Sequence, residues 1–148
     1  MSEAWIIDAA RTPRGIGRIG KGSLCDIHPQ HLLSTVLKSL AERNDLNTAD
    51  IDDVIIGCCT QVEKQSSCIA RMAAIDAGYA RSASGVTLDR FCGSGITSVN
   101  MAASSIMSGM EDLVVAGGVE MMSFTTGVTA QHPTDMYNLR LRAAHPMT

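Results

Sequence analysis

The residue best suited to chemistry is Cys92, which lies between a predicted strand and a predicted helix. Residues 86–88 alternate apolar and polar side chains, as in a strand, and from Ile96 apolar residues recur at helical spacing. Cys92 would therefore lie at a helix start, where unpaired backbone amides and the helix dipole favour a thiolate. Gly93 and Gly95 leave room for a substrate to approach the sulfur. We predict a nucleophilic cysteine, although a lone cysteine in an apolar chain is more commonly a small core residue.

The segment Asp89–Gly95 resembles the active-site motif of the thiolases, enzymes that join or cleave acyl-CoA thioesters. Three further segments resemble the family in its own order: Asp8–Pro13, Val54–Cys58 and Val114–Ser123. Together they cover essentially the whole chain. The resemblance implies that Cys92 takes up the acyl group and that its own backbone N–H helps to form an oxyanion hole.

The activity implied is acyl transfer that forms or cleaves acetoacetyl-CoA, with acetyl-CoA and acetoacetyl-CoA as substrates and no separate cofactor. Two alternatives stay open: a longer-chain 3-ketoacyl-CoA thiolase of fatty-acid degradation, and a catalytically silent fragment that binds partners. Asp89 stands where the family frequently has Asn, which bears on substrate preference and not on the chemistry.

The resemblance also implies the domain organisation. Residues 1–120 correspond to the family's first half without its last strand, and residues 121–148 to the start of an inserted loop region that helps to hold CoA. The family's catalytic histidine and second cysteine belong to its second half, so we expect an N-terminal part that does not turn over alone. The family pairs its subunits through the strand near Gly85–Arg90, which implies a homodimer or homotetramer at full length.

Composition excludes several classes of protein. The chain has 148 residues, of which 45% are hydrophobic and 3% aromatic, and this predicts one domain with an aliphatic core. A formal net charge of −3 does not indicate a basic surface that would bind nucleic acid. The five cysteines fit neither a disulfide framework nor a zinc site. There is no signal-peptide pattern and no membrane-spanning run, so we expect a cytoplasmic protein without a membrane or nucleic-acid partner.

The periodicity predicts strands and helices in alternation. Strands are expected at 4–7, 54–58, 86–88 and 112–116; helices are expected at 26–43, 68–77 and from Cys92 to about Met107, with Ser67 as a possible cap. In the last helix one face is apolar: Ile96, Val99, Ala103, Ile106 and Met107. This order is typical of an α/β fold with a mixed, mostly parallel sheet and helices on both faces.

The glycines between Gly15 and Gly20 match the G-x-G-x-x-G dinucleotide fingerprint. That motif requires the glycines to close a strand and open a helix, whereas here residues 8–14, which include Pro13, separate them from the strand. We interpret the segment as a loop and keep nucleotide binding as a weak alternative.

Other polar residues are predicted to have structural roles. Glu120 directly follows a strand, and we expect it to hold neighbouring loops by hydrogen bonds, as in the family. Arg90 could either lower the pKa of Cys92 or serve an interface or a salt bridge. None of the His-Pro pairs is taken as a catalytic base: His28, His132 and His145. Five methionines are predicted as core filler, although Met121 and Met122 could border an acyl pocket: Met101, Met107, Met110, Met121 and Met122.

Overall fold

The computed structural model describes residues 3–125 of the 148-residue chain. The chain divides into two compact units. The first contains residues 1–14 and 26–120, and the second contains residues 15–25 and 121–148. The predicted domain division at residue 120 stays a prediction, because most of residues 121–148 lie outside the described residues. The candidate site belongs entirely to the first unit.

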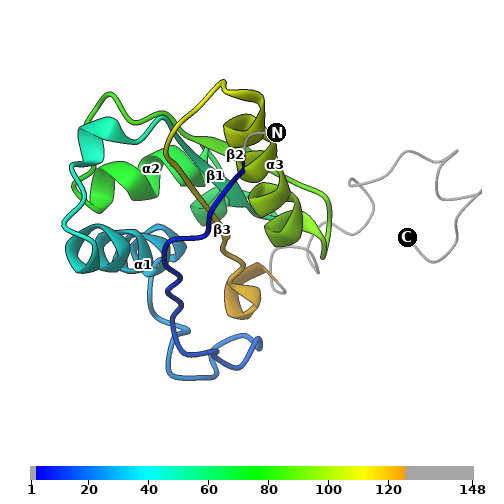
Figure 1. Ribbon diagram of the computed structural model, residues 1–148. Coiled ribbons are helices and arrows are strands. Elements are labelled where there is room, and N and C mark those ends of the chain that lie inside the picture. Colours follow the sequence, from blue (N-terminus) through cyan, green and yellow to red (C-terminus); the bar gives the residue numbers. More distant parts are fainter. Residues whose placement is uncertain (1–2, 126–148) are drawn as a thin grey trace, which may run out of the picture. The chain divides into compact units, whose positions relative to one another are not determined.

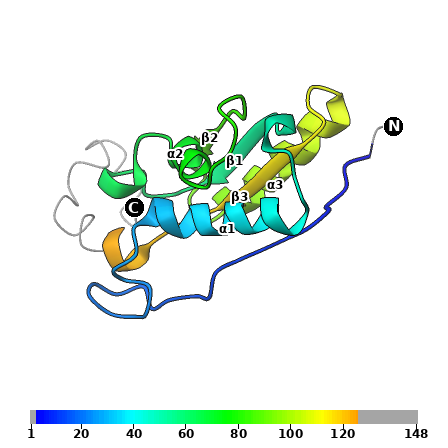
Figure 2. The same cartoon turned by 90° about the vertical axis from the view of Figure 1, so that its left-hand side faces the viewer.

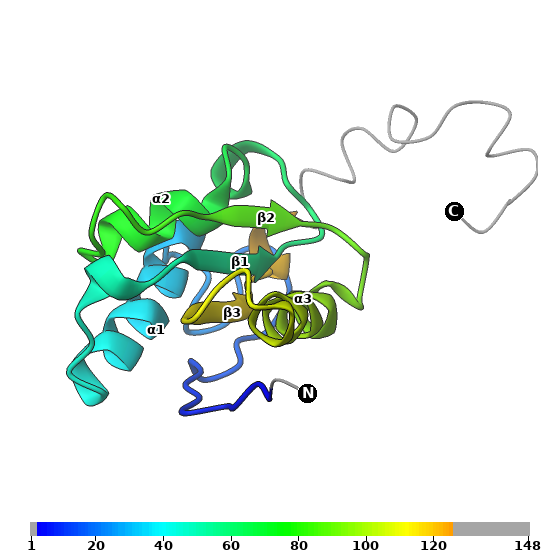
Figure 3. The same ribbon diagram turned by 45° about the horizontal axis from the view of Figure 1, so that its top comes forward.

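The first unit contains a three-stranded parallel sheet (Figures 1 and 3). Its strands are β1 (Asp53–Gly57), β2 (Val86–Leu88) and β3 (Val114–Gly118), in the order β2-β1-β3. In the register, Ile55 of β1 lies opposite Val86 on one side and Ala116 on the other. Residues 54–57 are buried, as expected for a central strand that is apolar on both faces.

Helices cover both faces of this sheet (Figures 1 and 2). Helices α1 (Pro29–Arg43) and α2 (Ile69–Asp76) pack on one face, and α3 (Ser94–Ser108) packs on the other. The predicted α/β class, the parallel sheet and the two helical layers are therefore confirmed.

The main core lies between the sheet and the pair α1 and α2. Tyr79 belongs to it, and its hydroxyl donates a hydrogen bond to the Leu37 carbonyl oxygen at 2.8 Å. Burial raises the pKa of Tyr79 to about 12. The most deeply buried large aliphatic side chains of this core are Leu33, Leu37, Ile51, Val54, Ile56 and Ile69. As the composition predicted, the core is almost entirely aliphatic.

Local signals explain where two helices begin and end. The first helix begins at Pro29, and Nδ1 of His28 accepts a hydrogen bond from the Gln30 amide (3.2 Å), as an N-cap side chain does. Helix α3 ends with the C-cap Gly109, whose φ of +76° suits a residue without a Cβ. The prediction that Ser67 caps helix α2 is wrong, because the N-cap residue is Cys68. Both Ser67 and the N-cap Cys68 have positive φ, and Cys68 makes no side-chain cap bond.

The predicted first strand at residues 4–7 does not form. Strand β1 is already paired with β2 on one side and β3 on the other, and residues 4–7 pair with neither of these edge strands. Without a partner strand, an apolar sequence does not form a strand. Trp5, Ile6 and Ile7 are between 74% and 81% exposed. The segment is instead held at Asp8, which accepts hydrogen bonds from side chains at the end of α1.

The apolar face predicted for α3 does not pack on the sheet. Ile96 is 72% exposed, whereas the residues turned towards the sheet are small: Ser94, Thr97, Ser98 and Ala102. The reason is the short distance between helix and sheet, across which the Ser98 hydroxyl donates to the Gly117 carbonyl oxygen at 2.7 Å. Large side chains would not fit there. The interpretation of the methionines as core filler is wrong for four of the five, because only Met121 is buried.

In the second unit, residues 15–25 form a loop that lies against Met122. A Cβ on Gly17 would lie 2.8 Å from the Cβ of Met122, so glycine is needed for this packing. Gly20 and Gly22 have positive φ values, and no helix opens in the segment. The prediction of a loop is confirmed. The helices that the structure describes in residues 3–125 are too short or too polar to cross a bilayer.

Candidate active site

Cys92 lies on the turn that joins β2 to α3. A hydrogen bond from the Gly93 amide to the Arg90 carbonyl oxygen (3.0 Å) closes this turn. Phe91, inside the turn, has a φ of +48°, and the Cys92 thiol is exposed. The predicted strand, turn and helix around Cys92 are confirmed, whereas its role as a nucleophile stays a prediction.

Two polar side chains hold the turn in shape. Asp89 Oδ1 accepts a hydrogen bond from the Phe91 amide at 2.7 Å. The buried Ser94 hydroxyl accepts from the Arg90 amide at 2.9 Å and donates to the Phe91 carbonyl oxygen at 2.6 Å. A left-handed residue other than glycine costs about 1–2 kcal/mol, so the conformation persists because these bonds compensate for it.

The turn rests directly on the end of the sheet. A Cβ added to Gly57 would lie 2.5 Å from the carbonyl carbon of Ser94 and 2.7 Å from the Gly95 nitrogen. A Cβ on Gly118, the last residue of β3, would lie 3.6 Å from the Gly95 Cα. The first turn of α3 thus sits on glycine backbone, which fixes the height of Cys92 above the sheet.

The backbone amides of the turn are divided between internal bonds and open positions. The Gly93 and Ser94 amides bond to carbonyl oxygens within the turn. Within residues 3–125, the Cys92 amide has no acceptor, and the N-cap Gly93 supplies no side-chain bond. An open amide beside a sulfur at the positive end of a 15-residue helix is suited to stabilise an oxyanion that forms there.

A carboxylate clamps the neighbouring loop beside this turn. Glu120 Oε2 accepts hydrogen bonds from the amides of Cys59 (2.8 Å) and Thr60 (3.2 Å). Its Oε1 accepts from Nε2 of the buried Gln65 at 3.1 Å. The predicted structural, hydrogen-bonding role of Glu120 is confirmed.

The adjacent cysteines Cys58 and Cys59 are held as thiols. Burial, followed by the Glu120 charge, raises the pKa of Cys58 to about 12. The pKa of Cys59 is also raised, first by burial and then by the charges of Asp89 and Glu120. Neither cysteine therefore competes as a thiolate near neutral pH.

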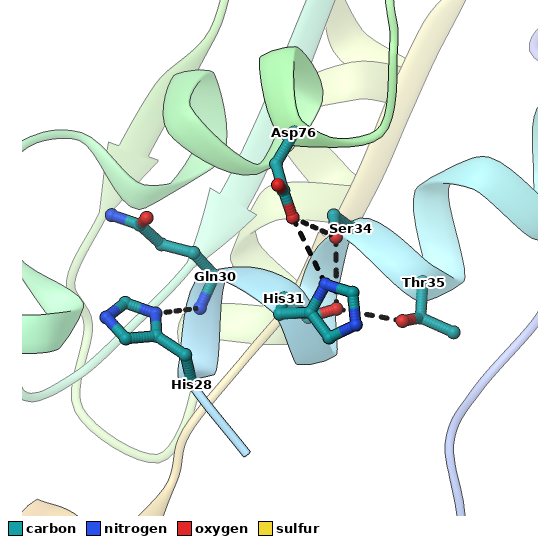
Figure 4. Close-up of polar contacts among 6 residues, drawn as sticks. All are labelled: His28, Gln30, His31, Ser34, Thr35 and Asp76. Atoms are coloured by element: carbon teal, nitrogen blue, oxygen red, sulfur yellow. Dashed lines mark hydrogen bonds and ion pairs between the residues drawn. The ribbon is translucent and has the colours of Figure 1, made fainter.

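A second polar cluster joins α1 to α2 (Figure 4). The Ser34 hydroxyl donates to Asp76 Oδ2 at 2.5 Å, and His31 Nδ1 lies 3.4 Å from the same oxygen. The Ser34 bond is the main cause that lowers the pKa of Asp76. The serine bonds to the aspartate and not to the histidine, and His31 and Asp76 are exposed, so the cluster lacks the order of a catalytic triad.

The structure also locates the remaining candidates. Within residues 3–125, no three His, Cys, Asp or Glu side chains are grouped so as to hold a metal ion, and Arg90 forms no ion pair. His28 is the N-cap of α1. His132 and His145, which were set aside as bases, lie outside the described residues.

Comparison with known proteins decides the family. Residues 4–148 match the family model described as "Thiolase, N-terminal domain". The chain belongs to the thiolase family. Steroid 3-ketoacyl-CoA thiolase FadA6 of Mycobacterium tuberculosis is 44% identical to this thiolase-family chain over 123 residues, 83% of this chain and 30% of that protein. The 3-oxoadipyl-CoA/3-oxo-5,6-dehydrosuberyl-CoA thiolase of Escherichia coli K12 is 45% identical over 124 residues, with the same shares.

A solved structure agrees with the fold of this thiolase-family chain. The crystal structure of the Bacillus anthracis acetyl-CoA acetyltransferase matches it with a TM-score of 0.76 at 36% identity. The match covers 83% of this chain and 30% of that one. The chain therefore spans about 30% of the length of the relatives named here.

Sequence reasoning missed three residues of the site. Gly57 ends a buried strand, and a glycine there is itself a signal that another backbone approaches closely. Gln65 is a fully buried glutamine, for which the sequence carries no local signal. Cys59 follows a strand beside the turn of Cys92, and only the pairing of β1 with β2 reveals this.

Proposed function

We propose that this thiolase-family chain carries the nucleophile of an acyl-CoA C-acyltransferase that works through an acyl-cysteine at Cys92. One observation supports the proposal above the others. The exposed Cys92 lies on a turn held by Asp89 and Ser94, and its own amide has no acceptor among the described residues.

The first half-reaction follows from this geometry. The Cys92 thiolate attacks the thioester carbonyl of an acyl-CoA, and the carbonyl oxygen becomes an oxyanion. The Cys92 amide, with the positive end of α3, stabilises that charge. The tetrahedral intermediate collapses and releases the CoA thiolate, which leaves the acyl group on Cys92. In synthesis, the carbanion of a second thioester then attacks the acyl-cysteine carbonyl, the new C–C bond forms and Cys92 leaves as a thiolate. In cleavage, the Cys92 thiolate instead attacks the 3-keto carbonyl of a 3-ketoacyl-CoA, the C–C bond breaks, the departing acetyl-CoA carbanion takes up a proton, and free CoA then attacks the acyl-cysteine.

We favour acetoacetyl-CoA as the compound formed or cleaved, with acetyl-CoA as the acyl donor in synthesis. The structural neighbour named an acetyl-CoA acetyltransferase supports this choice. The relatives named steroid 3-ketoacyl-CoA and 3-oxoadipyl-CoA thiolases support the alternative of a longer 3-ketoacyl substrate. CoA thioesters are the substrates, and no separate cofactor is required.

The test compares acyl groups on the purified chain. The chain is incubated separately with acetyl-CoA, acetoacetyl-CoA and a longer 3-ketoacyl-CoA, and the mass of the trapped acyl-enzyme is measured, with Cys92→Ser as the control. We expect acetyl transfer from acetyl-CoA and acetoacetyl-CoA to be fastest, and none in the control. Faster transfer from the longer thioester would favour the alternative substrate class.

A catalytically silent, partner-binding chain is the competing function. It predicts that no thioester acylates Cys92 while the chain is folded by circular dichroism. That result would reject acyl transfer and leave binding as the remaining role.

The assembled protein is, in this proposal, at least a homodimer, and a homotetramer is the next larger form. Strand β2 is at the edge of the sheet, and Val86 is 38% exposed, so its outer backbone groups are open to another strand. Sedimentation of the full-length protein should show a dimer or larger, and a fully active monomer at micromolar concentration would refute it. The five unpaired cysteines support a reducing, cytoplasmic location.

A further inference from the structure

Cys59 lies beside the turn that carries Cys92. In the register of the parallel pair, Gly57 is opposite Leu88, and the Cys58 amide donates to the Leu88 carbonyl oxygen at 2.9 Å. Neighbouring strands are about 4.8 Å apart, and their carboxyl ends meet at one edge of the sheet. Cys59 therefore leaves the sheet next to the chain that enters the Cys92 turn.

The turn brings Cys92 back towards this edge. Its closing bond runs from the Gly93 amide to the Arg90 carbonyl oxygen, and a Cβ on Gly57 would lie 2.7 Å from the Gly95 nitrogen. The chain just after Cys92 therefore contacts the strand two residues before Cys59. The backbone of Cys59 is fixed by the Glu120 clamp at 2.8 Å. The Cys59 thiol is half-buried, and that of Cys92 is exposed. A disulfide requires the two Cα atoms to come within about 7 Å, and both cysteines lie on short segments at the same edge of the sheet.

The interactions of the Cys59 thiol are consistent with this placement. After burial and the charges of Asp89 and Glu120, the charge of Cys92 is a further cause that raises the pKa of Cys59, followed by a hydrogen bond to Asp89.

The neighbouring thiols are placed differently. Whereas Cys59 is half-buried, Cys58 is fully buried. Its sulfur is buried against Gln65 at 3.5 Å. The Cys68 sulfur donates to the Gly85 carbonyl oxygen at 3.3 Å, at the beginning of β2, the end away from Cys92.

We propose that Cys59 is a resolving thiol for Cys92, so that a hydroperoxide converts the pair into a Cys59–Cys92 disulfide. The proposal goes beyond acyl transfer and rests only on Cys92 as the reactive thiol of the proposed function. The Cys92 thiolate attacks the hydroperoxide, the O–O bond breaks, and Cys92 becomes a sulfenic acid while an alcohol, or water from hydrogen peroxide, leaves. The Cys59 sulfur then attacks the Cys92 sulfur, the S–O bond breaks, and the departing hydroxide takes the Cys59 proton to form water. Two thiols are oxidised by two electrons and one peroxide is reduced.

This disulfide would act on the nucleophile in two ways. While it exists, Cys92 has no free sulfur for a thioester, so acylation stops. It also prevents oxidation of Cys92 to the sulfinic acid, which ordinary thiols do not reverse, whereas a dithiol restores the disulfide to two thiols.

The experiment treats the purified, folded chain with one equivalent of hydrogen peroxide, blocks the remaining thiols, and maps cross-linked peptides without reduction. Cys59→Ser is compared with the matched variant Cys58→Ser, and circular dichroism confirms that both are folded. We expect the cross-link in wild type and Cys58→Ser, its loss in Cys59→Ser, and at least a several-fold increase in Cys92 sulfinic acid in Cys59→Ser.

Other outcomes would overturn the proposal. One is a cross-link from Cys92 to Cys58, Cys68 or Cys25. The other is an amount of Cys92 sulfinic acid in Cys59→Ser that equals the amount in wild type. The outcome of this oxidation experiment does not depend on whether a thioester acylates Cys92. A Cys59–Cys92 disulfide in a chain that no thioester acylates would reject acyl transfer and keep this proposal, and the reverse pair of results would do the opposite.

Discussion

Gly57→Ala should displace the start of α3 and with it Cys92. The added Cβ would lie 2.5 Å from the Ser94 carbonyl carbon and 2.6 Å from its oxygen, whereas ordinary contacts begin at 3.4 Å. Both are backbone atoms and cannot rotate away, so helix and strand must separate by about 0.9 Å (3.4 minus 2.5). Overpacking of this kind costs about 1–3 kcal/mol of unfolding free energy. A shift of about 1 Å at a reacting group can reduce a rate about 10²-fold.

The matched control is Gly117→Ala in the neighbouring strand. A Cβ there would meet only the Ile56 Cδ1 atom, at 3.8 Å. Without a clash, the change should leave stability equal or raise it by about 0.4–1 kcal/mol through the unfolded state. Urea unfolding gives the stability of both variants, and the rate of acylation of Cys92 by acetyl-CoA gives the position of the nucleophile. If Gly57→Ala matches Gly117→Ala in both measurements, the close contact does not position the turn.

Three further changes test separate contacts. Tyr79→Phe removes the buried bond to the Leu37 carbonyl oxygen and should cost about 1 kcal/mol in urea unfolding; no loss would mean that the bond contributes nothing. Glu120→Gln places an amide where one carboxylate oxygen accepts hydrogen bonds, so the Cys59 amide should exchange its hydrogen about tenfold faster or more, and unchanged exchange would refute the clamp. Bonds from the backbone amides of residues 112 and 113, in that order of importance, lower the pKa of Asp52 below 3.8. The ionised Asp52 therefore stabilises the fold fully above pH 3.8, and this contribution is lost as the pH falls through the lower pKa of the folded protein. Asp52→Asn should reduce the loss of unfolding free energy in acid, as measured by urea unfolding across pH. An unchanged dependence of unfolding free energy on pH would contradict this.

The elements around the site were predictable because their signals are local. A two-residue alternation predicted β2, and the apolar residues that recur at helical spacing from Ile96 predicted α3. The position of Cys92 follows from the change of period between strand and helix, which needs no knowledge of distant residues. The role of Glu120 was also accessible, since an acidic residue directly after a strand lies among loops.

Other features depend on contacts between distant segments, which periodicity does not encode. The periodicity marks one apolar face of α3, yet the closeness of Gly57 to the helix selects small residues for the buried side. The apolar run at residues 4–7 lacked a partner strand, so hydrophobicity alone was misleading. The approach of Cys59 to the Cys92 turn follows only from the pairing of β1 with β2.

The most direct test of the central claim is to map the acyl group after brief incubation of the folded chain with acetyl-CoA. Acid quenching preserves the thioester, and peptide mass spectrometry then locates it. We expect one acetyl group on Cys92, sensitive to hydroxylamine and absent in Cys92→Ser. An acetyl group on Cys25, Cys58, Cys59 or Cys68 before Cys92, or equal labelling in Cys92→Ser, would contradict the assignment of the nucleophile.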